Sequence, residues 1–110
     1  MRKHLLFLYS RNKLRSPTAE AIFADHPAVE VDSAGLCSDA EVPVTLEQIE
    51  WADLILVMEP VHRRRLNQRF GRTLAGKQVV VLDIPDRYEF MEPAVIELLK
   101  QRCERYFPNS

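Results

Sequence analysis

One short segment near the start of the chain combines residue types that bind anions. Residues 4–9 are nearly all apolar or aromatic, and a polar run, 10–15, separates them from Ser16 and Pro17. Serine followed by proline is typical of a helix N-cap and the first helical position. A helix N-terminus presents free backbone N–H groups and the positive end of the helix dipole. With Arg15 beside it, this segment predicts an anion-binding site.

The composition restricts the class of protein. A chain of 110 residues is long enough for one domain, 1–110, with its own core. Its hydrophobic fraction of 46% and charged fraction of 28% are ordinary for globular proteins. The formal net charge is −1, so the chain as a whole is not suited to coating nucleic acid. Any anion binding must therefore come from local clusters of charge.

The two cysteines, Cys37 and Cys103, are too few and too far apart to indicate a disulfide framework or a zinc site. We therefore expect reduced thiols, with no metal and no cofactor. The apolar run near the N-terminus is too short for a signal peptide. No stretch approaches the roughly 20 apolar residues that a membrane span requires. These features predict a cytoplasmic protein without a membrane partner.

Strand-like and helix-like patterns alternate along the chain. Continuous apolar runs predict three buried strands. An alternating pattern predicts that the second of the four strands is half-buried or lies at an edge of the sheet. The strands are expected at 4–9, 29–33, 52–58 and 78–82. Helices are expected at 17–24, 46–51, 61–70 and from 93 onward. Thr45 and Gln48 have the spacing of a capping box, Gly35 is expected in a turn, and Gly71 is expected to end a helix.

This order of elements predicts an α/β fold with a parallel sheet covered by helices. Ligands of such sheets bind at the carboxyl ends of the strands. The loops after Tyr9, Ser33, Met58 and Leu82 should therefore gather at one edge of the sheet.

The motifs in these loops keep a recognisable order over most of the chain. They are Asn12, Arg15-Ser16-Pro17-Thr18-Ala19-Glu20, Ser33-Ala34-Gly35, the run 52–59 and Ile84-Pro85-Asp86. Together they resemble the low-molecular-weight protein tyrosine phosphatase family. The resemblance implies a flavodoxin-like three-layer sandwich, with a four-stranded parallel sheet and helices on both faces.

The resemblance also implies roles for individual residues. The phosphate-binding loop would consist of Ser10, Arg11, Asn12, Lys13, Leu14, Arg15 and Ser16. Arg15 matches the arginine of the family, whose planar fork suits contact with two phosphate oxygens. Asp86 matches the general acid, although Arg87 follows it where the family usually has proline.

The nucleophile position departs from the family pattern. Counting six residues back from Arg15 gives Tyr9, where the family has cysteine. The family's cysteine reacts as a thiolate because backbone N–H groups and the arginine lower its pKa. A phenol has a higher ordinary pKa, and the ring would enter the space of the phosphate. We therefore predict a phosphatase-like protein that binds phosphate or a phosphorylated group, such as one on a phosphoprotein, without efficient hydrolysis.

Two alternatives stay open at this point. One is an active phosphatase for phosphotyrosine or small phosphoesters, using a different nucleophile such as Ser10 or Cys37. The other is a binding module in which the basic helix around Arg63–Arg65 contacts an acidic partner or RNA. Nucleic acid is the less favoured ligand because the net charge is near zero and no aromatic residues are interleaved. A solvated helix face is the simpler interpretation of this cluster.

Overall fold

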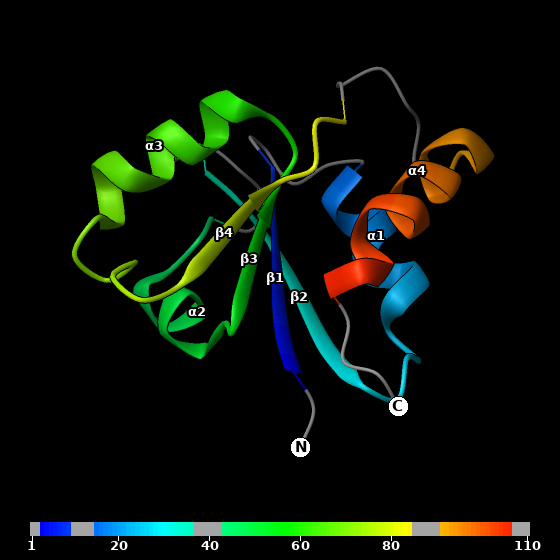
Figure 1. Ribbon diagram of the computed structural model, residues 1–110, viewed down its shortest axis with the longest axis horizontal. Coiled ribbons are helices and arrows are strands. Elements are labelled where there is room, and N and C mark those ends of the chain that lie inside the picture. Colours follow the sequence, from blue (N-terminus) through cyan, green and yellow to red (C-terminus); the bar gives the residue numbers. More distant parts are fainter. Residues whose placement is uncertain (1–2, 10–14, 37–42, 85–90, 107–110) are drawn as a thin grey trace.

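A four-stranded parallel sheet forms the centre of the computed structural model, which describes residues 3–9, 15–36, 43–84 and 91–106 (Figure 1). The strands are β1 (Lys3–Tyr9), β2 (Val29–Gly35), β3 (Leu54–Val57) and β4 (Gln78–Val81). The helices are α1 (Arg15–Phe23), α2 (Leu46–Trp51), α3 (Pro60–Phe70) and α4 (Pro93–Cys103), with a short 3-10 helix, Glu104–Tyr106, at the end. The predicted alternation of strands and helices is confirmed.

The sheet separates two hydrophobic cores. Its strand order is β2-β1-β3-β4, and every pair is parallel. Helices α1 and α4 cover one face and α2 and α3 cover the other (Figure 1). Side chains alternate along β1, so that Leu5, Phe7 and Tyr9 enter the first core while Leu6 and Leu8 enter the second. This arrangement confirms the predicted α/β three-layer sandwich, and the strand order is that of flavodoxin-like folds.

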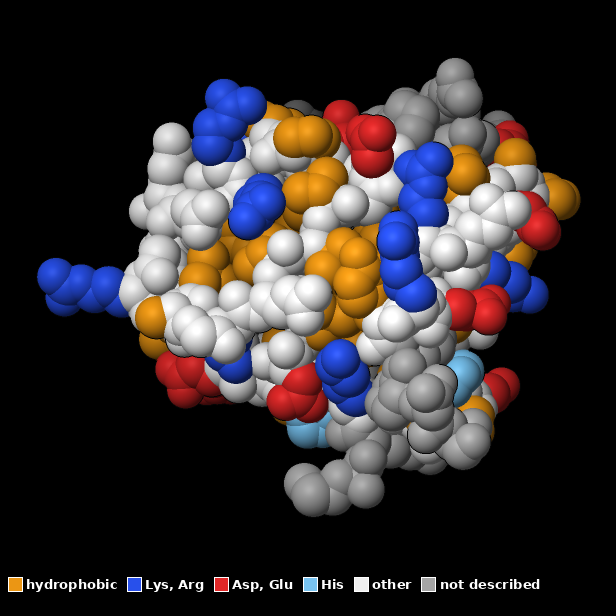
Figure 2. Space-filling view, in the orientation of Figure 1, with side chains coloured by type: hydrophobic (Ala, Val, Ile, Leu, Met, Phe, Trp, Pro, Cys, Tyr) orange, Lys and Arg blue, Asp and Glu red, His pale blue; other side chains and the backbone are white. Residues whose placement is uncertain are grey.

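The two central strands are the ones that the continuous apolar runs predicted best. Residues 5–8 of β1 and 54–57 of β3 are fully buried because each strand has neighbours on both sides and helices on both faces. The buried strand predicted at 78–82 is partly wrong, because β4 is an edge strand and Val79 and Val81 are only half-buried. Apolar side chains are therefore exposed in the middle of the face shown in Figure 2, between the two helical layers.

Two predictions at element boundaries are corrected. Helix α1 begins at Arg15, so Ser16 and Pro17 lie inside its first turn, not at the N-cap and first position. Proline is tolerated there because the first four N–H groups of a helix have no intrahelical acceptor. Gly35 is not in a turn: it is the last residue of β2 and pairs with Tyr9. The strand is longer than predicted because its last residues pair with β1, which its own alternation does not reveal.

Two other boundary predictions are confirmed. Thr45 and Gln48 form both hydrogen bonds of a capping box, with N–H to side-chain oxygen distances of 3.0 and 3.2 Å. Gly71 follows the last residue of α3, where a Cβ atom would lie only 2.8 Å from the carbonyl oxygen of Asn67. Glycine has no Cβ atom and avoids this contact, so the chain can pass close to the last turn of the helix as it leaves. Within the described residues, no helix is long and apolar enough to cross a membrane.

Candidate functional site at the carboxyl ends of the strands

The carboxyl ends of the four strands meet at one edge of the sheet, at the top in Figure 1. Helix α1 begins at this edge, and so does α3, two residues after Met58. The backbone N–H groups of the first turn of each helix and the positive ends of both helix dipoles therefore lie on the same side of the sheet. This is the edge at which the sequence predicted that the loops gather.

Tyr9 is a core side chain at this edge. It is the last residue of β1 and is only 5% exposed. Its ring meets that of His62 edge to face, with the centroids 6.5 Å apart and the planes at 88°. Its carbonyl oxygen accepts a hydrogen bond from the N–H of Leu36 at 2.8 Å, which fixes the end of β1 against β2. The position that matches the family's nucleophile thus carries a buried aromatic ring.

His62 also lies at this edge, and it directly precedes the basic run Arg63–Arg65 in the sequence. It is 1% exposed, whereas Arg63, Arg64 and Arg65 are exposed. The N–H of Glu59 donates to His62 Nδ1 at 3.2 Å, and the carboxylate of Glu59 caps the helix in return. The two residues have the spacing of a capping box but not its usual residue types, so the sequence carries no clear signal for the inward position of His62.

Both flanks of the segment that contains Asp86 are anchored at the same edge. The N–H of Ile84 donates to the carbonyl oxygen of Met58 at 2.9 Å. On the other side, the N–H of Met91 donates to the hydroxyl of Thr18 at 3.0 Å, and Thr18 is fully buried. The chain therefore leaves this edge after β4 and returns to the second turn of α1.

Most of the remaining predicted site residues lie outside the part of the chain that the structure describes. Arg15 and Ser16 start α1, which places their backbone at the expected edge. The loop residues Ser10, Arg11, Asn12, Lys13 and Leu14 lie outside the described residues, as do Asp86, Arg87 and Cys37. The roles assigned to them from the resemblance stay predictions.

Two further motif residues connect α1 to β2. The buried hydroxyl of Ser33 donates to the carboxylate of Glu20, so the Ser33-Ala34-Gly35 motif is hydrogen-bonded to α1. The contact helps to hold α1 against the sheet and leaves its N-terminus at the strand ends. The motif residues thus have structural roles that need no catalysis.

The described thiol is not suited to catalysis. Cys103 ends α4 and is fully buried, and burial raises the pKa of its thiol from 9.0 to about 12, with a smaller contribution from the charge of Glu104. A thiolate is the reactive form of cysteine, so Cys103 is inert at neutral pH. Among the described residues, no group of three or more His, Cys, Asp or Glu side chains could hold a metal ion.

Solved structures resemble this chain closely in fold. No family model and no curated protein sequence matches the chain. The tyrosine phosphatase Wzb from Escherichia coli, solved in complex with phosphate, is 23% identical with a TM-score of 0.75, and the match covers 96% of each chain. The YwlE arginine phosphatase from Geobacillus stearothermophilus is 24% identical with a TM-score of 0.72, covering 94% of this chain and 90% of that one.

A third structure carries the name of the family that the motifs resemble. SP-PTP from Streptococcus pyogenes, a low-molecular-weight protein tyrosine phosphatase, is 14% identical with a TM-score of 0.75, and the match covers 94% of this chain and 90% of that one. The chain therefore has the fold of the low-molecular-weight protein tyrosine phosphatases.

Proposed function

We propose that this protein binds phosphate, or a phosphorylated group on a larger molecule, between the end of β1 and the start of α1, without efficient hydrolysis. The observation that carries this proposal is the position of Tyr9. It stands where the resemblance requires the nucleophilic cysteine, and its ring is buried and packed against His62. The proposed protein is phosphatase-like in fold and in its anion site, and lacks the nucleophile.

The arrangement of helix termini supports anion binding. The N-terminus of α1 and that of α3 both lie at the carboxyl ends of the strands (Figure 1). Each contributes free N–H groups and a partial positive charge, which favour a bound phosphate. Arg15, as the first residue of α1, would add a charge-assisted hydrogen bond. The structure of Wzb in complex with phosphate supports the same ligand for this fold.

The chemistry of tyrosine supports the absence of efficient hydrolysis. A phenol has an ordinary pKa near 10, so little phenolate exists at neutral pH. A covalent route in this fold needs a nucleophile that is ionised and pointed at phosphorus. The aromatic contact with His62 holds the ring of Tyr9 within the core, where it packs and does not attack. Asp86, the proposed general acid, would then have no leaving group to protonate.

The natural ligand that we propose is a phosphorylated group, such as one on a phosphoprotein, in the cytoplasm. An active phosphatase using Ser10 or Cys37 is the alternative that an assay of hydrolysis separates from this proposal. The other alternative is that the exposed Arg63–Arg65 run binds an acidic partner. The control variant Arg63→Met separates this alternative from the proposal.

Binding is tested by the thermal midpoint of unfolding in phosphate, with sodium chloride at matched ionic strength as the reference. A ligand that binds only the folded state stabilises it, by about 2.7 kcal/mol at 100 times Kd. We expect the midpoint to rise with phosphate, and the rise to be lost in Arg15→Met. The matched control is Arg63→Met, which removes an exposed arginine from α3 and should leave the rise intact. No rise at millimolar phosphate, or loss of the rise in the control alone, would contradict the proposal.

A further inference from the structure

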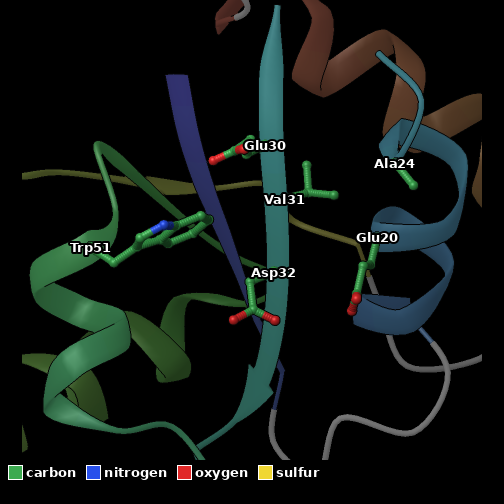
Figure 3. Close-up of a pocket in the computed structure, with 6 residues that line it drawn as sticks. All are labelled: Glu20, Ala24, Glu30, Val31, Asp32 and Trp51. Atoms are coloured by element: carbon green, nitrogen blue, oxygen red, sulfur yellow. The ribbon is translucent and has the colours of Figure 1, made fainter. Parts of the chain in front are cut away.

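We propose that the outer edge of β2 is a docking site for an extended, positively charged segment of a partner protein. The site is separate from the proposed anion site. It lies along the side of the sheet between α1 and α2, whereas the anion site lies at the ends of the strands (Figures 1 and 3).

A groove follows this edge. One cavity of about 400 Å³ is lined by Glu20, Ala24, Glu30, Val31, Asp32 and Trp51 (Figure 3). A second cavity, of about 390 Å³, is lined by α2 and shares Asp32 and Trp51 with the first. Because the two cavities have residues in common, they are adjacent, and we call the two together the β2 groove. Its floor is the strand itself and its walls are the two helices.

The floor of the groove offers unpaired backbone groups. In a parallel ladder, alternate residues turn both N–H and C=O toward the same neighbouring strand. The N–H of Lys3 donates to Ala28, and the N–H of Leu36 donates to Tyr9, so the even-numbered residues of β2 face β1. Val31 therefore turns its N–H and C=O to the groove, where no described residue is hydrogen-bonded to them. An extended chain laid along β2 would complete the ladder through these groups.

Three contacts define the extent of the open edge. On the amino side, the N–H of Val29 donates to the carbonyl oxygen of His26 at 3.5 Å. The N–H of Ser33 is already taken by the side chain of Asp32, at 2.9 Å. Further along, the N–H of Val44 donates to the carbonyl oxygen of Gly35 at 2.9 Å, so the chain itself covers the carboxyl end of the strand. The open part is centred on Val31 and accommodates a short segment. We infer that about three residues of a partner would pair here.

The walls of the groove are acidic. Glu30 and Asp32 point toward the side of Trp51, and Glu20 lies on the opposite wall (Figure 3). Asp32 accepts from the side-chain amide of Gln48 at 3.0 Å, and Glu20 accepts from the hydroxyl of Ser33, so both of these partners are neutral groups. Glu30 lies 3.0 Å from His4 Nε2. No lysine or arginine is among the described residues that line the groove, which makes a cationic occupant complementary to it.

Trp51 adds an aromatic surface for the side chains of such a segment. One face of its indole stacks on the ring of His4, with centroids 4.5 Å apart and planes at 7°. The stacking holds the indole in place at the wall of the groove, where the ring is half-buried. Lysine and arginine side chains pack well on such a ring and gain a cation–π attraction.

The same charges argue against a second copy of this chain as the occupant. Pairing of two β2 edges would bring Glu30 and Asp32 of both copies together, and like charges at a strand pair are destabilising. Charged side chains at an edge strand are a common protection against self-association. The edge thus excludes its own copy and accepts a strand of opposite charge.

Trp51 provides the measurement because it is the only tryptophan in the chain. The probe is a nine-residue peptide with lysine at alternate positions among threonine and valine, titrated in chloride buffer without phosphate while the fluorescence is recorded. We expect a saturable change of fluorescence that weakens as the salt concentration rises. We expect the same affinity in Arg15→Met, since α1 begins at the ends of the strands and the residues that line the groove lie along β2.

The protein variants test the acidic walls. Glu30→Gln combined with Asp32→Asn removes both charges and leaves one oxygen acceptor on each side chain, and should weaken binding by about tenfold or more. The matched control, Glu97→Gln combined with Glu104→Gln, removes two exposed carboxylates from the C-terminal part of the chain and should leave the affinity unchanged. Equal weakening in the control would overturn the proposal. So would an unchanged affinity in the groove variant.

Changes in the peptide test the strand pairing without touching the fold of the protein. Methylation of the peptide nitrogens that would donate to β2 should abolish binding, whereas methylation of those on the opposite edge should not. Equal binding of both methylated peptides would reveal charge attraction without strand pairing and would overturn the proposal. Absence of binding by the unmodified peptide would overturn it as well.

Discussion

Tyr9 and Cys103 lie in the same core, between the sheet and helices α1 and α4, yet they differ in what their surroundings do to a reactive group. Tyr9 ends a strand at the edge where two helices begin, and in the proposed site a thiol in its place would be stabilised by N–H groups and positive helix ends. Cys103 ends α4 among apolar side chains, and burial raises the pKa of its thiol to about 12. The chain thus has a phenol at the position where the proposed site would need a thiolate, and has at Cys103 a thiol that is inert.

The comparison indicates that a reactive group needs both the right residue type and the right position. A thiolate is stabilised by nearby N–H groups and positive charge, and is destabilised by removal of water. Cys103 therefore cannot take over the role of the missing nucleophile, although it lies in the same core. The predictions below test the two positions separately.

The largest expected effect is on the alkylation of Cys103. A rise of the pKa from 9.0 to about 12 leaves about a thousandfold less thiolate at pH 8. Iodoacetamide should leave Cys103 unmodified in the folded protein and modify it fully in denaturant, as followed by mass mapping of the peptide that contains it. Modification in the folded state at the rate of a free thiol would contradict the inert position assigned to Cys103.

A smaller effect is expected from truncating Tyr9. The ring is 5% exposed and packs in the core, so Tyr9→Ala should lower the free energy of unfolding by about 3 kcal/mol. Tyr9→Phe keeps the ring and its contact with His62 and is the matched control, expected to cost much less. Urea unfolding at neutral pH measures both. A loss under about 1 kcal/mol in Tyr9→Ala would mean that the ring is not a core element.

The smallest effect is on the pH dependence of stability. The folded-state pKa of Cys103, about 12, lies above the unfolded value of 9.0, so the unfolded chain releases a proton that the folded protein keeps. The contribution of this thiol is therefore fully present below pH 9 and is lost as the pH rises toward 12, by up to about 1.4 kcal/mol per pH unit.

Urea unfolding of the wild-type protein and of Cys103→Ala at pH 8, 9 and 10 measures this contribution. The alanine variant lacks the thiol, so the difference in stability between the two proteins should narrow as the pH rises. A constant difference across this range would contradict the assignment of the shift to Cys103.

The fold was largely predictable from the sequence because its main signals are local. The apolar runs of β1 and β3 indicated strands buried on both faces, and the capping box at Thr45 indicated the start of α2. The extension of β2 through Gly35 and the half-buried state of β4 were not predictable in this way. They depend on which strands become neighbours in the sheet.

The candidate site was predictable to a smaller extent. The gathering of the strand ends and the position of Tyr9 follow from the strand pattern and the motif spacing. The packing of His62 against Tyr9 and the hydrogen bond from Met91 to Thr18 were not predictable. Each contact joins two segments that are far apart in the sequence, and no local pattern relates them. The β2 groove was missed for the same reason, because its walls come from two helices on either side of the strand.

The most direct test of the central claim is hydrolysis of 4-nitrophenyl phosphate by the wild-type protein, by Tyr9→Cys and by Tyr9→Cys combined with Arg15→Met. We expect the wild-type protein to stay at the uncatalysed background. Turnover should appear in Tyr9→Cys and should be lost again when Arg15 is replaced. Wild-type turnover in the range of ordinary enzymes, roughly 1–10³ s⁻¹, would contradict the account.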